Sequence, residues 1–171
     1  VSMKLIRHSA QSLMMGIVAV LFLSACQQPA PKPAPPGLTA EQITALHDAG
    51  FHQTSDGWEI AGNETILFGH NIGELDPGGR EIVSRIGRAL LAVDIRQVQV
   101  LGFTDNTGTP EYNRKLSKRR ADAVAAVLAA IGMRSQDIDA EGMGDKDPVA
   151  SNTTAEGRAE NRRVAIVVSS P

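Results

Sequence analysis

The sequence predicts an α/β sandwich in which helices pack on one or both faces of a β-sheet. Apolar segments with strand character alternate with amphipathic helical segments through residues 51–168, and a chain of that kind forms layers of this type. The last apolar run, Val164–Val168, is unbroken, which is typical of a central strand buried on both faces. Residues 38–171 suffice for one domain of this class and are too few for two.

Ahead of this domain, the chain has the features of an exported lipoprotein. Two basic residues precede the apolar run 13–23, which is too short to span a bilayer as a mature helix. The run closes with Leu23-Ser24-Ala25-Cys26, the pattern of a bacterial lipobox. We therefore expect a signal peptide over residues 1–25 and acylation of Cys26, which would anchor the protein permanently. The alternative is an ordinary signal peptide followed by an incidental cysteine.

Residues 26–37 are expected to be the lipidated cysteine and a proline-rich tether. Alternating prolines favour an extended polyproline II spacer, which at about 3.1 Å per residue reaches roughly 35 Å. Gln27 follows the cysteine, and by resemblance to Gram-negative lipoproteins the absence of Asp there favours the outer membrane. We expect the protein to be lipid-anchored in that membrane and to face the periplasm.

Charge and composition argue against several classes of function. Removing residues 1–25 changes the formal net charge from −2 to −4, so there is no basic footprint for nucleic acid. His47, His52 and His70 have no metal-ligand spacing with cysteine or carboxylates, and we expect no metal and no cofactor. No serine or cysteine has a convincing base partner. A non-enzymatic binding module is favoured, and a periplasmic wall hydrolase is the less favoured alternative.

Residues 38–63 are predicted to form a short helix and a hairpin. Thr39 is the N-cap of the helix, and Gln42 completes a capping box. The hairpin joins short strands near residues 51–54 and 58–60. A helix of this length is marginal alone, so the apolar side chains of this extension must pack on something. They are Ile43, Leu46, Phe51 and Trp58.

Residues 64–171 are predicted to form the main domain, a βαβαββ mixed sheet packed with two long helices. Asp76 and Pro77 start the first of these helices, and Thr109 and Pro110 start the second. The other predicted elements are strands over residues 65–68, 97–100, 138–141 and 164–168, with a polar loop over residues 142–161. We place the core at Val98, Val100, Val124, Leu128 and residues 164–168, without Leu46.

Two residues break the pattern of the second long helix. At about 100° per residue, its apolar side chains share one face and most of its polar side chains lie elsewhere. Asn113 and Arg120 instead fall in the middle of the apolar face. Helical side chains lean toward the N-terminus, so Arg120 points toward the strand end that is followed by Asp105.

A guanidinium buried without a partner is costly, and two interpretations account for it. The first is an internal salt bridge between Asp105 and Arg120 that pins the loop to the helix. The second is a pocket with one anionic and one cationic wall, which would bind a zwitterion. Both stay open on physical grounds, because structural ion pairs are common.

Several motifs of this region resemble the OmpA-like domain. They are GFTDNTG at residues 102–108, Tyr112-Asn113, Leu116-Ser117, Arg119-Arg120-Ala121 and GRAENRRV at residues 157–164. That family includes the C-terminal domains of OmpA, the Pal lipoproteins and the flagellar stator protein MotB. The resemblance covers residues 64–168.

The resemblance implies non-covalent binding of peptidoglycan through the diaminopimelate of its stem peptide. Asp105 would receive the ammonium group of diaminopimelate, and Arg120 its carboxylate. The chain departs from the family at Phe103, where the family usually has histidine. The remaining residues that the resemblance assigns to the site are Asn113, Thr107, Arg162 and the backbone around Asn71.

The lipobox, tether, short helix and hairpin together resemble YfiB-type outer-membrane lipoproteins. That resemblance implies capture of a small periplasmic repressor, which would release an inner-membrane diguanylate cyclase. Ile43, Leu46, Phe51 and Trp58 are then the candidate contacts; alternatively, they merely cover the sheet edge. A purely structural anchor like Pal, tying the outer membrane to the cell wall, is the alternative function. The sequence is also compatible with a homodimer.

Overall fold

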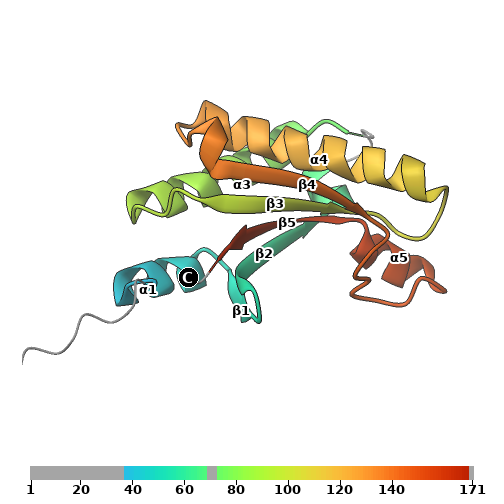
Figure 1. Ribbon diagram of the computed structural model, residues 1–171, viewed down its shortest axis with the longest axis horizontal. Coiled ribbons are helices and arrows are strands. Elements are labelled where there is room, and N and C mark those ends of the chain that lie inside the picture. The colour runs from blue at the N-terminus through green and yellow to red at the C-terminus, as the bar shows by residue number, and fades with distance from the viewer. Residues whose placement is uncertain (1–36, 69–72, 170–171) are drawn as a thin grey trace, which may run out of the picture. The chain divides into compact units, whose positions relative to one another are not determined.

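The computed structural model describes residues 37–68 and 73–169 (Figure 1). The signal peptide, Cys26 and the tether lie outside the described residues. Within those two ranges, none of the helices combines the length and the hydropathy of a membrane span. The helices and strands are, in chain order, α1 Ala40–Asp48, β1 His52–Thr54, β2 Gly57–Asn63, α2 Glu64–Phe68, α3 Pro77–Ala92, β3 Val98–Phe103, α4 Pro110–Ala130, the 3-10 helix η1 Ser135–Asp137, β4 Ile138–Gly144, α5 Ala155–Asn161 and β5 Arg163–Val168.

The five strands form one mixed sheet in the order β1-β2-β5-β3-β4. Strands β3 and β4 are parallel, and every other neighbouring pair is antiparallel. Strand β5 lies in the middle, and all six of its residues are buried. The predicted mixed sheet and the predicted central strand are therefore confirmed.

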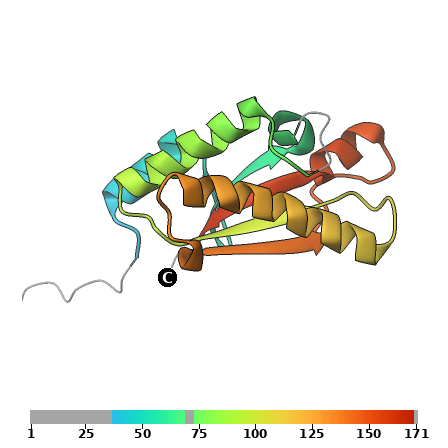
Figure 2. The same ribbon diagram turned by 90° about the horizontal axis from the view of Figure 1, so that it is seen from above.

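Helices α3 and α4 lie over one face of the sheet, as the two views show (Figures 1 and 2). Val98 and Val100 of β3 belong to the same buried cluster as Val124 and Leu128 of α4. The helix comes very close to the sheet at Gly102, where a Cβ atom would lie 2.1 Å from the backbone oxygen of Ser117. Only glycine permits this approach, which brings the first half of α4 against the end of β3.

The prediction of a strand over residues 65–68 is wrong, because these residues form helix α2. The strand runs one segment earlier, as β2, and ends at Asn63. The side-chain oxygen of Asn63 accepts a hydrogen bond from the backbone N–H of Ile66 at 2.9 Å, and Asn at such a position favours a helix start. Leu67 and Phe68 then point into the core. Capping and tertiary packing outweigh the β-propensity of this segment.

The polar segment predicted as a loop over residues 142–161 contains a further helix, α5. Its N-cap is Thr154, whose hydroxyl accepts a hydrogen bond from the backbone N–H of Gly157 at 3.0 Å. The helix has almost no apolar periodicity, so the pattern that predicts amphipathic helices does not detect it.

The N-terminal extension is integrated into the fold more deeply than predicted. Its capping box between Thr39 and Gln42 is confirmed, but Leu46 is fully buried, and Phe51 and Trp58 are also buried in the main core. The expectation that the core excludes Leu46 is therefore wrong, and these three side chains offer no free surface to a partner. Ile43 is the exposed member of the four, at 40%.

The hairpin contributes to the central sheet itself. Its second strand, β2, pairs with β5 from Trp58 to Asn63. The predicted domain limit between residues 63 and 64 falls at the junction of β2 and α2, inside this compact unit.

Candidate functional site

Three strand ends converge beside the start of α4. Strands β2 and β5 are antiparallel, with Asn63 paired to Arg163, so the next residues outward, Glu64 and Arg162, are neighbours. The backbone N–H of Glu64 donates to the backbone oxygen of Arg162 at 2.8 Å. Strand β3 runs antiparallel to β5 on its other side, which brings Asp105 to the same place.

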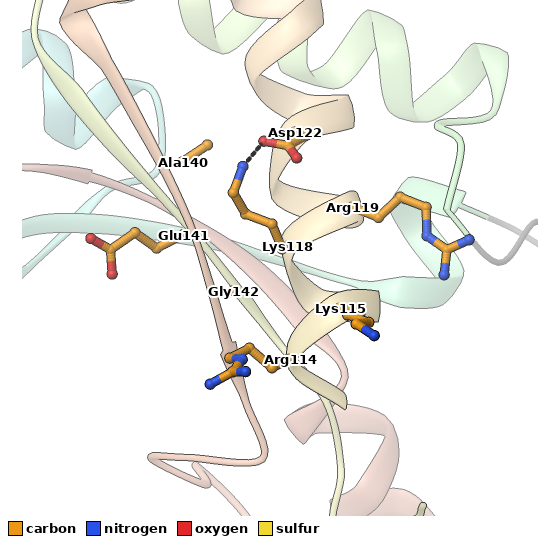
Figure 3. A pocket seen from close by; sticks show the side chains of 8 residues that line it. All are labelled: Arg114, Lys115, Lys118, Arg119, Asp122, Ala140, Glu141 and Gly142. Carbon is orange, nitrogen blue, oxygen red and sulfur yellow. Dashed lines mark hydrogen bonds and ion pairs between the residues drawn. The ribbon is translucent and has the colours of Figure 1, made fainter. Parts of the chain in front are cut away.

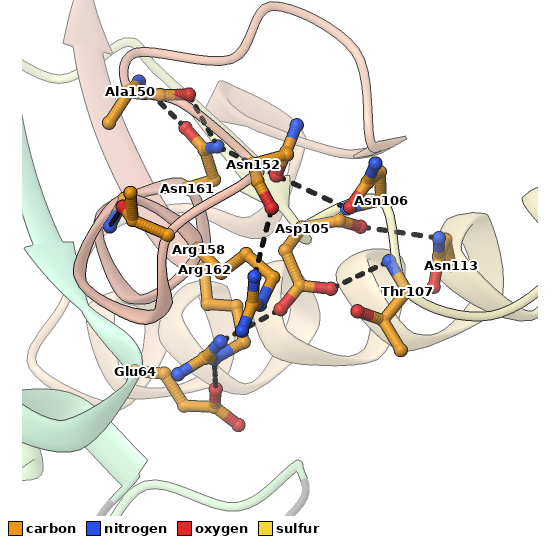
Figure 4. Close-up of polar contacts among 12 residues, drawn as sticks. Glu64, Asp105, Asn106, Thr107, Asn113, Ala150, Asn152, Arg158, Asn161 and Arg162 are labelled. Carbon is orange, nitrogen blue, oxygen red and sulfur yellow. Dashed lines mark hydrogen bonds and ion pairs between the residues drawn. The ribbon is translucent and has the colours of Figure 1, made fainter.

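Four charged side chains here form what we call the ion-pair chain, which consists of Asp105, Arg162, Glu64 and Arg120. Arg162 Nη1 lies 2.7 Å from Asp105 Oδ2, and Arg162 Nε lies 2.6 Å from Glu64 Oε2. The other oxygen of Glu64 accepts a hydrogen bond from Arg120 Nη2. Opposite charges therefore alternate along the ion-pair chain, and Glu64 bridges the two guanidinium groups. Figure 4 shows Arg162 between Asp105 and Glu64.

Arg120 is the most buried member, with 3% of its surface exposed. Its Nε and Nη1 atoms are buried and have no hydrogen-bond partner among the described residues. The guanidinium carbon lies 5.7 Å from the ring centroid of Phe68, within reach of a cation–π interaction. Burial lowers the pKa of Arg120, and the charge of Glu64 partly opposes this effect. The Arg120 guanidinium is thus buried with only part of its hydrogen-bonding capacity in use.

Asp105 is held in its charged form. Burial acts to raise its pKa, but the hydrogen bond from Arg162 and those from Thr107 outweigh burial, so that the pKa lies below its usual value. The backbone N–H of Thr107 donates to Asp105 Oδ1 at 2.8 Å. The same ion pair with Asp105 raises the pKa of Arg162. Both groups are charged at neutral pH.

A network of asparagines supports the loop that carries Asp105 (Figure 4). Asn113 Nδ2 donates to the backbone oxygen of Asp105 at 3.3 Å. Asn161 is fully buried, and its Nδ2 donates to Asn152 Oδ1 at 2.9 Å. The same Asn152 oxygen accepts from the backbone N–H of Asn106 at 3.4 Å. The loop of residues 104–109 is therefore tied both to α4 and to α5.

Most of the predicted site residues lie together in the structure, but their ion pairs differ from the predicted one. Asp105, Thr107, Asn113 and Arg162 contact one another as described, and Arg120 joins them through Glu64. The Asp105–Arg120 salt bridge considered from the sequence is not formed, because each residue has another ion-pair partner. Asn71 lies outside the described residues.

Glu64 is the residue that sequence reasoning missed. The pattern of residues 65–68 predicts a strand, which places Glu64 before that strand, whereas the structure places it directly after β2. The sequence feature that indicates the position of Glu64 is Asn63, because asparagine is a favourable N-cap residue. A helix beginning there would have placed Glu64 at the edge of the sheet.

Phe103, where the resemblance led to an expectation of histidine, lies in a separate small cluster with Ala165 and Val167. The guanidinium carbon of Arg163 lies 3.7 Å from the Phe103 ring centroid. The Arg163 side chain also donates from Nη2 to the backbone oxygen of Asp147 at 3.1 Å. Phe103 thus supports the loop after β4 and contributes no atom to the ion-pair chain.

A concavity of about 480 Å³ lies between α4 and β4, away from the ion-pair chain (Figure 3). Four basic side chains line it, but Lys115 pairs with Glu111 and Lys118 pairs with Asp122. None of the predicted site residues belongs to this concavity. The described residues also contain no group of three or more histidine, cysteine or acidic side chains that could hold a metal. The ion-pair chain is therefore the candidate site.

The family of the chain follows from the match of its sequence to known families. A model of the OmpA family matches residues 67–162, which is more than half of the chain and runs from the end of α2 to Arg162. This chain belongs to the OmpA family. The resemblance seen in the motifs around Asp105 and Arg120 is thereby confirmed.

Relatives within the OmpA family extend over the N-terminal part as well. Outer-membrane lipoprotein YfiB from Pseudomonas aeruginosa is 46% identical over 162 residues, which cover 94% of this chain and 95% of that protein. Putative lipoprotein YfiB from Escherichia coli is 34% identical, with 98% of this chain and 100% of that protein covered.

Solved structures confirm the OmpA-family fold. The cell wall anchor of the T6SS from Pseudomonas aeruginosa superposes with a TM-score of 0.65 at 34% identity, covering 76% of this chain and 97% of that chain. The peptidoglycan-associated lipoprotein from Burkholderia pseudomallei superposes with a TM-score of 0.54 at 27% identity, covering 60% and 86%.

Proposed function

We propose that the protein is an outer-membrane lipoprotein that binds peptidoglycan non-covalently through the diaminopimelate of the stem peptide. The observation that carries this proposal is the ion-pair chain, in which a charged carboxylate and a buried guanidinium lie at one edge of an OmpA-family domain. Relatives named as outer-membrane lipoproteins, as a cell wall anchor and as peptidoglycan-associated support it. Acylated Cys26 would hold the protein to the membrane, with the domain in the periplasm.

The chemistry of the site fits a zwitterion on one carbon atom. Diaminopimelate offers an ammonium group and a carboxylate side by side, and charge-assisted hydrogen bonds are stronger than neutral ones. We assign the ammonium group to Asp105, which the structure keeps charged. We assign the carboxylate to Arg120, with Asn113, Thr107 and Arg162 around it. Binding of this kind needs no nucleophile or general base, which is consistent with a non-enzymatic module.

Binding to purified sacculi tests this assignment. Asp105→Ala or Arg120→Ala should weaken co-sedimentation roughly ten- to a hundredfold, because a hydrogen bond to a charged group contributes about 1.5–3 kcal/mol. The two losses should not add, since each change also removes part of the network around the other residue.

Matched controls exist on the exposed surface of α4. Asp122→Ala and Arg114→Ala remove the same charges without touching the ion-pair chain, and should bind sacculi like the wild type. If Asp105→Ala and Arg120→Ala both bind sacculi like the wild type, the ion-pair chain has a purely structural role. Release of glycan fragments during the assay would instead indicate a hydrolase.

We further propose a regulatory role, in which the protein captures a small periplasmic repressor of a diguanylate cyclase. Full-length similarity to YfiB lipoproteins, including the extension, favours this role over that of a structural anchor alone. Ile43 is the candidate contact that remains, because it is exposed on α1 while the other three candidates, Leu46, Phe51 and Trp58, are buried. Helix α1 is docked through Leu46 and through the side-chain amide of Gln42, which donates to the backbone oxygen of Val93 at 3.0 Å.

Ile43→Ser separates the two roles. A change at an exposed position costs at most about 0.5 kcal/mol of stability, so sacculus binding should be unchanged while affinity for the purified repressor falls. Val149→Ser, at another exposed apolar residue, is the control. If Ile43→Ser captures the repressor like the wild type, Ile43 is not a contact. If the wild type itself does not capture the repressor, the structural-anchor role is favoured.

A further inference from the structure

Glu64 occupies the place that the proposed ligand carboxylate needs. Its carboxylate contacts Arg120 through one oxygen and Arg162 through the other, at 2.6 Å for the second contact. Arg120 Nη2 is therefore already engaged, and the two remaining nitrogens of that guanidinium, Nε and Nη1, are buried. A ligand carboxylate can reach Arg120 only if Glu64 gives up its contact.

Glu64 can move more easily than its partner. The side chain of Glu64 is 22% exposed, whereas that of Arg120 is 3% exposed. Helix α2, which begins at Glu64, is one short element of five residues. Arg162, whose side chain is 32% exposed, remains as an ion-pair partner for the Glu64 carboxylate after its displacement from Arg120. The exchange of one carboxylate for another on Arg120 thus requires no rearrangement of the core.

We infer that Glu64 is a specificity-determining residue, which makes the site accept zwitterions and reject ligands that carry only a carboxylate. This inference rests on the proposed function. The ion-pair chain consists of two carboxylates and two guanidinium groups, and its formal charge is zero. A bound zwitterion keeps that sum at zero. A bound plain carboxylate leaves three anions around two cations, which repel one another in a partly buried site.

The same sum of formal charges predicts the behaviour of a variant that lacks the charge of Glu64. In Glu64→Gln the ion-pair chain has one carboxylate and two guanidinium groups, so a bound plain carboxylate restores neutrality. Such a ligand also meets no competitor on Arg120. The variant should therefore lose the preference for zwitterions, whereas a residue that only braces the fold would change the affinities for all ligands in parallel.

The experiment compares two probes of equal length on the full-length protein in detergent, by titration calorimetry. The probes are meso-diaminopimelate and pimelate, which has the same carbon chain and both carboxylates but no amino groups. We expect the wild type to prefer diaminopimelate, and Glu64→Gln to reduce that preference roughly tenfold or more, the scale of one charge-assisted interaction. Glu111→Gln removes an exposed carboxylate paired only with Lys115, and should keep the wild-type preference.

The outcomes separate this inference from the proposed function. If the wild type binds diaminopimelate and Glu64→Gln keeps the same preference, the inference is wrong and the proposed function stands. If the wild type binds neither diaminopimelate nor sacculi, the proposed function fails, and the inference with it.

A structure of the wild type with meso-diaminopimelate gives a test that does not depend on the folding of a variant. The ligand carboxylate should contact Arg120 in place of Glu64, with Glu64 retained on Arg162 or turned toward the ligand ammonium group. A ligand bound at Asp105 while the Glu64–Arg120 contact persists would overturn the inference.

Discussion

The two halves of α4 bury faces of opposite chemistry. In the first half the buried side chains include Asn113, Ser117 and Arg120, and in the second half, where all of them are apolar, they include Val124 and Leu128. All five are at least nine-tenths buried, so depth does not distinguish them. Apolar burial is the main stabilising contribution in a fold, whereas a buried ion pair adds little net stability. One helix thus has a half that stabilises the fold and a half that contributes to the candidate site.

The polar half is organised, although it is not optimised for stability. Ser117 Oγ accepts a hydrogen bond from the backbone N–H of Gly144 at 3.0 Å and so fixes the end of β4. Asn113 holds the loop through the backbone oxygen of Asp105. Arg120, by contrast, has two buried nitrogens that find no hydrogen-bond partner in the described part of the chain. Buried polar atoms without partners cost free energy in the folded state, so this half of α4 is not arranged for stability alone.

The largest effect on stability should come from the apolar half. Leu128→Ala removes a fully buried side chain and should lower the free energy of unfolding by about 2–5 kcal/mol, as large-to-small core changes do. Urea unfolding measures this loss. Binding to sacculi per folded molecule should remain at the wild-type level, and a matching loss of affinity in folded protein would show that the two halves are not independent.

A smaller effect on stability, with a larger effect on binding, is expected in the polar half. Arg120→Met keeps most of the apolar stem and removes the buried charge. Glu64 retains Arg162 as a partner, so the free energy of unfolding should change by no more than about 1 kcal/mol. Sacculus binding should weaken roughly ten- to a hundredfold, as for Arg120→Ala. A destabilisation of about 3–5 kcal/mol, typical when a buried pair is broken, would make Arg120 a structural residue and remove the contrast between the halves.

The smallest effect is a pH dependence contributed by Asp105. The pKa of this carboxyl is lower in the folded state than its ordinary value of 3.8. Its contribution to stability is therefore fully present above the ordinary pKa, and is lost as the pH falls through the lower folded value. The urea midpoint of Asp105→Asn should thus fall less steeply than that of the wild type on acidification below about pH 4. Identical slopes in the two proteins would show that the ion pair with Arg162 does not lower this pKa.

Much of this fold could be predicted because its signals are local. The capping box at Thr39, the Pro starts of α3 and α4 and the apolar run of β5 each lie within a few residues of sequence. The burial of Asn113 and Arg120 was also predictable, since helical periodicity places them on the face shared by Val124 and Leu128. By contrast, α2 and α5 are short and depend on single caps, at Asn63 and Thr154, that composition does not emphasise.

The sequence by itself determined which side chains would be buried on α4, that Asp105 would lie at a strand end beside them, and which family the motifs indicate. Only the tertiary structure decided the pairing: Glu64 bridges Arg120 and Arg162, and Asp105 pairs with Arg162. These residues are up to 98 positions apart in the chain, and they meet because β2 and β3 flank β5 with their ends at one edge. Strand order and register are set by long-range packing, which no local pattern encodes. For the same reason Leu46 and Trp58, which the resemblance makes candidate partner contacts, are part of the core, where α1 and β2 pack.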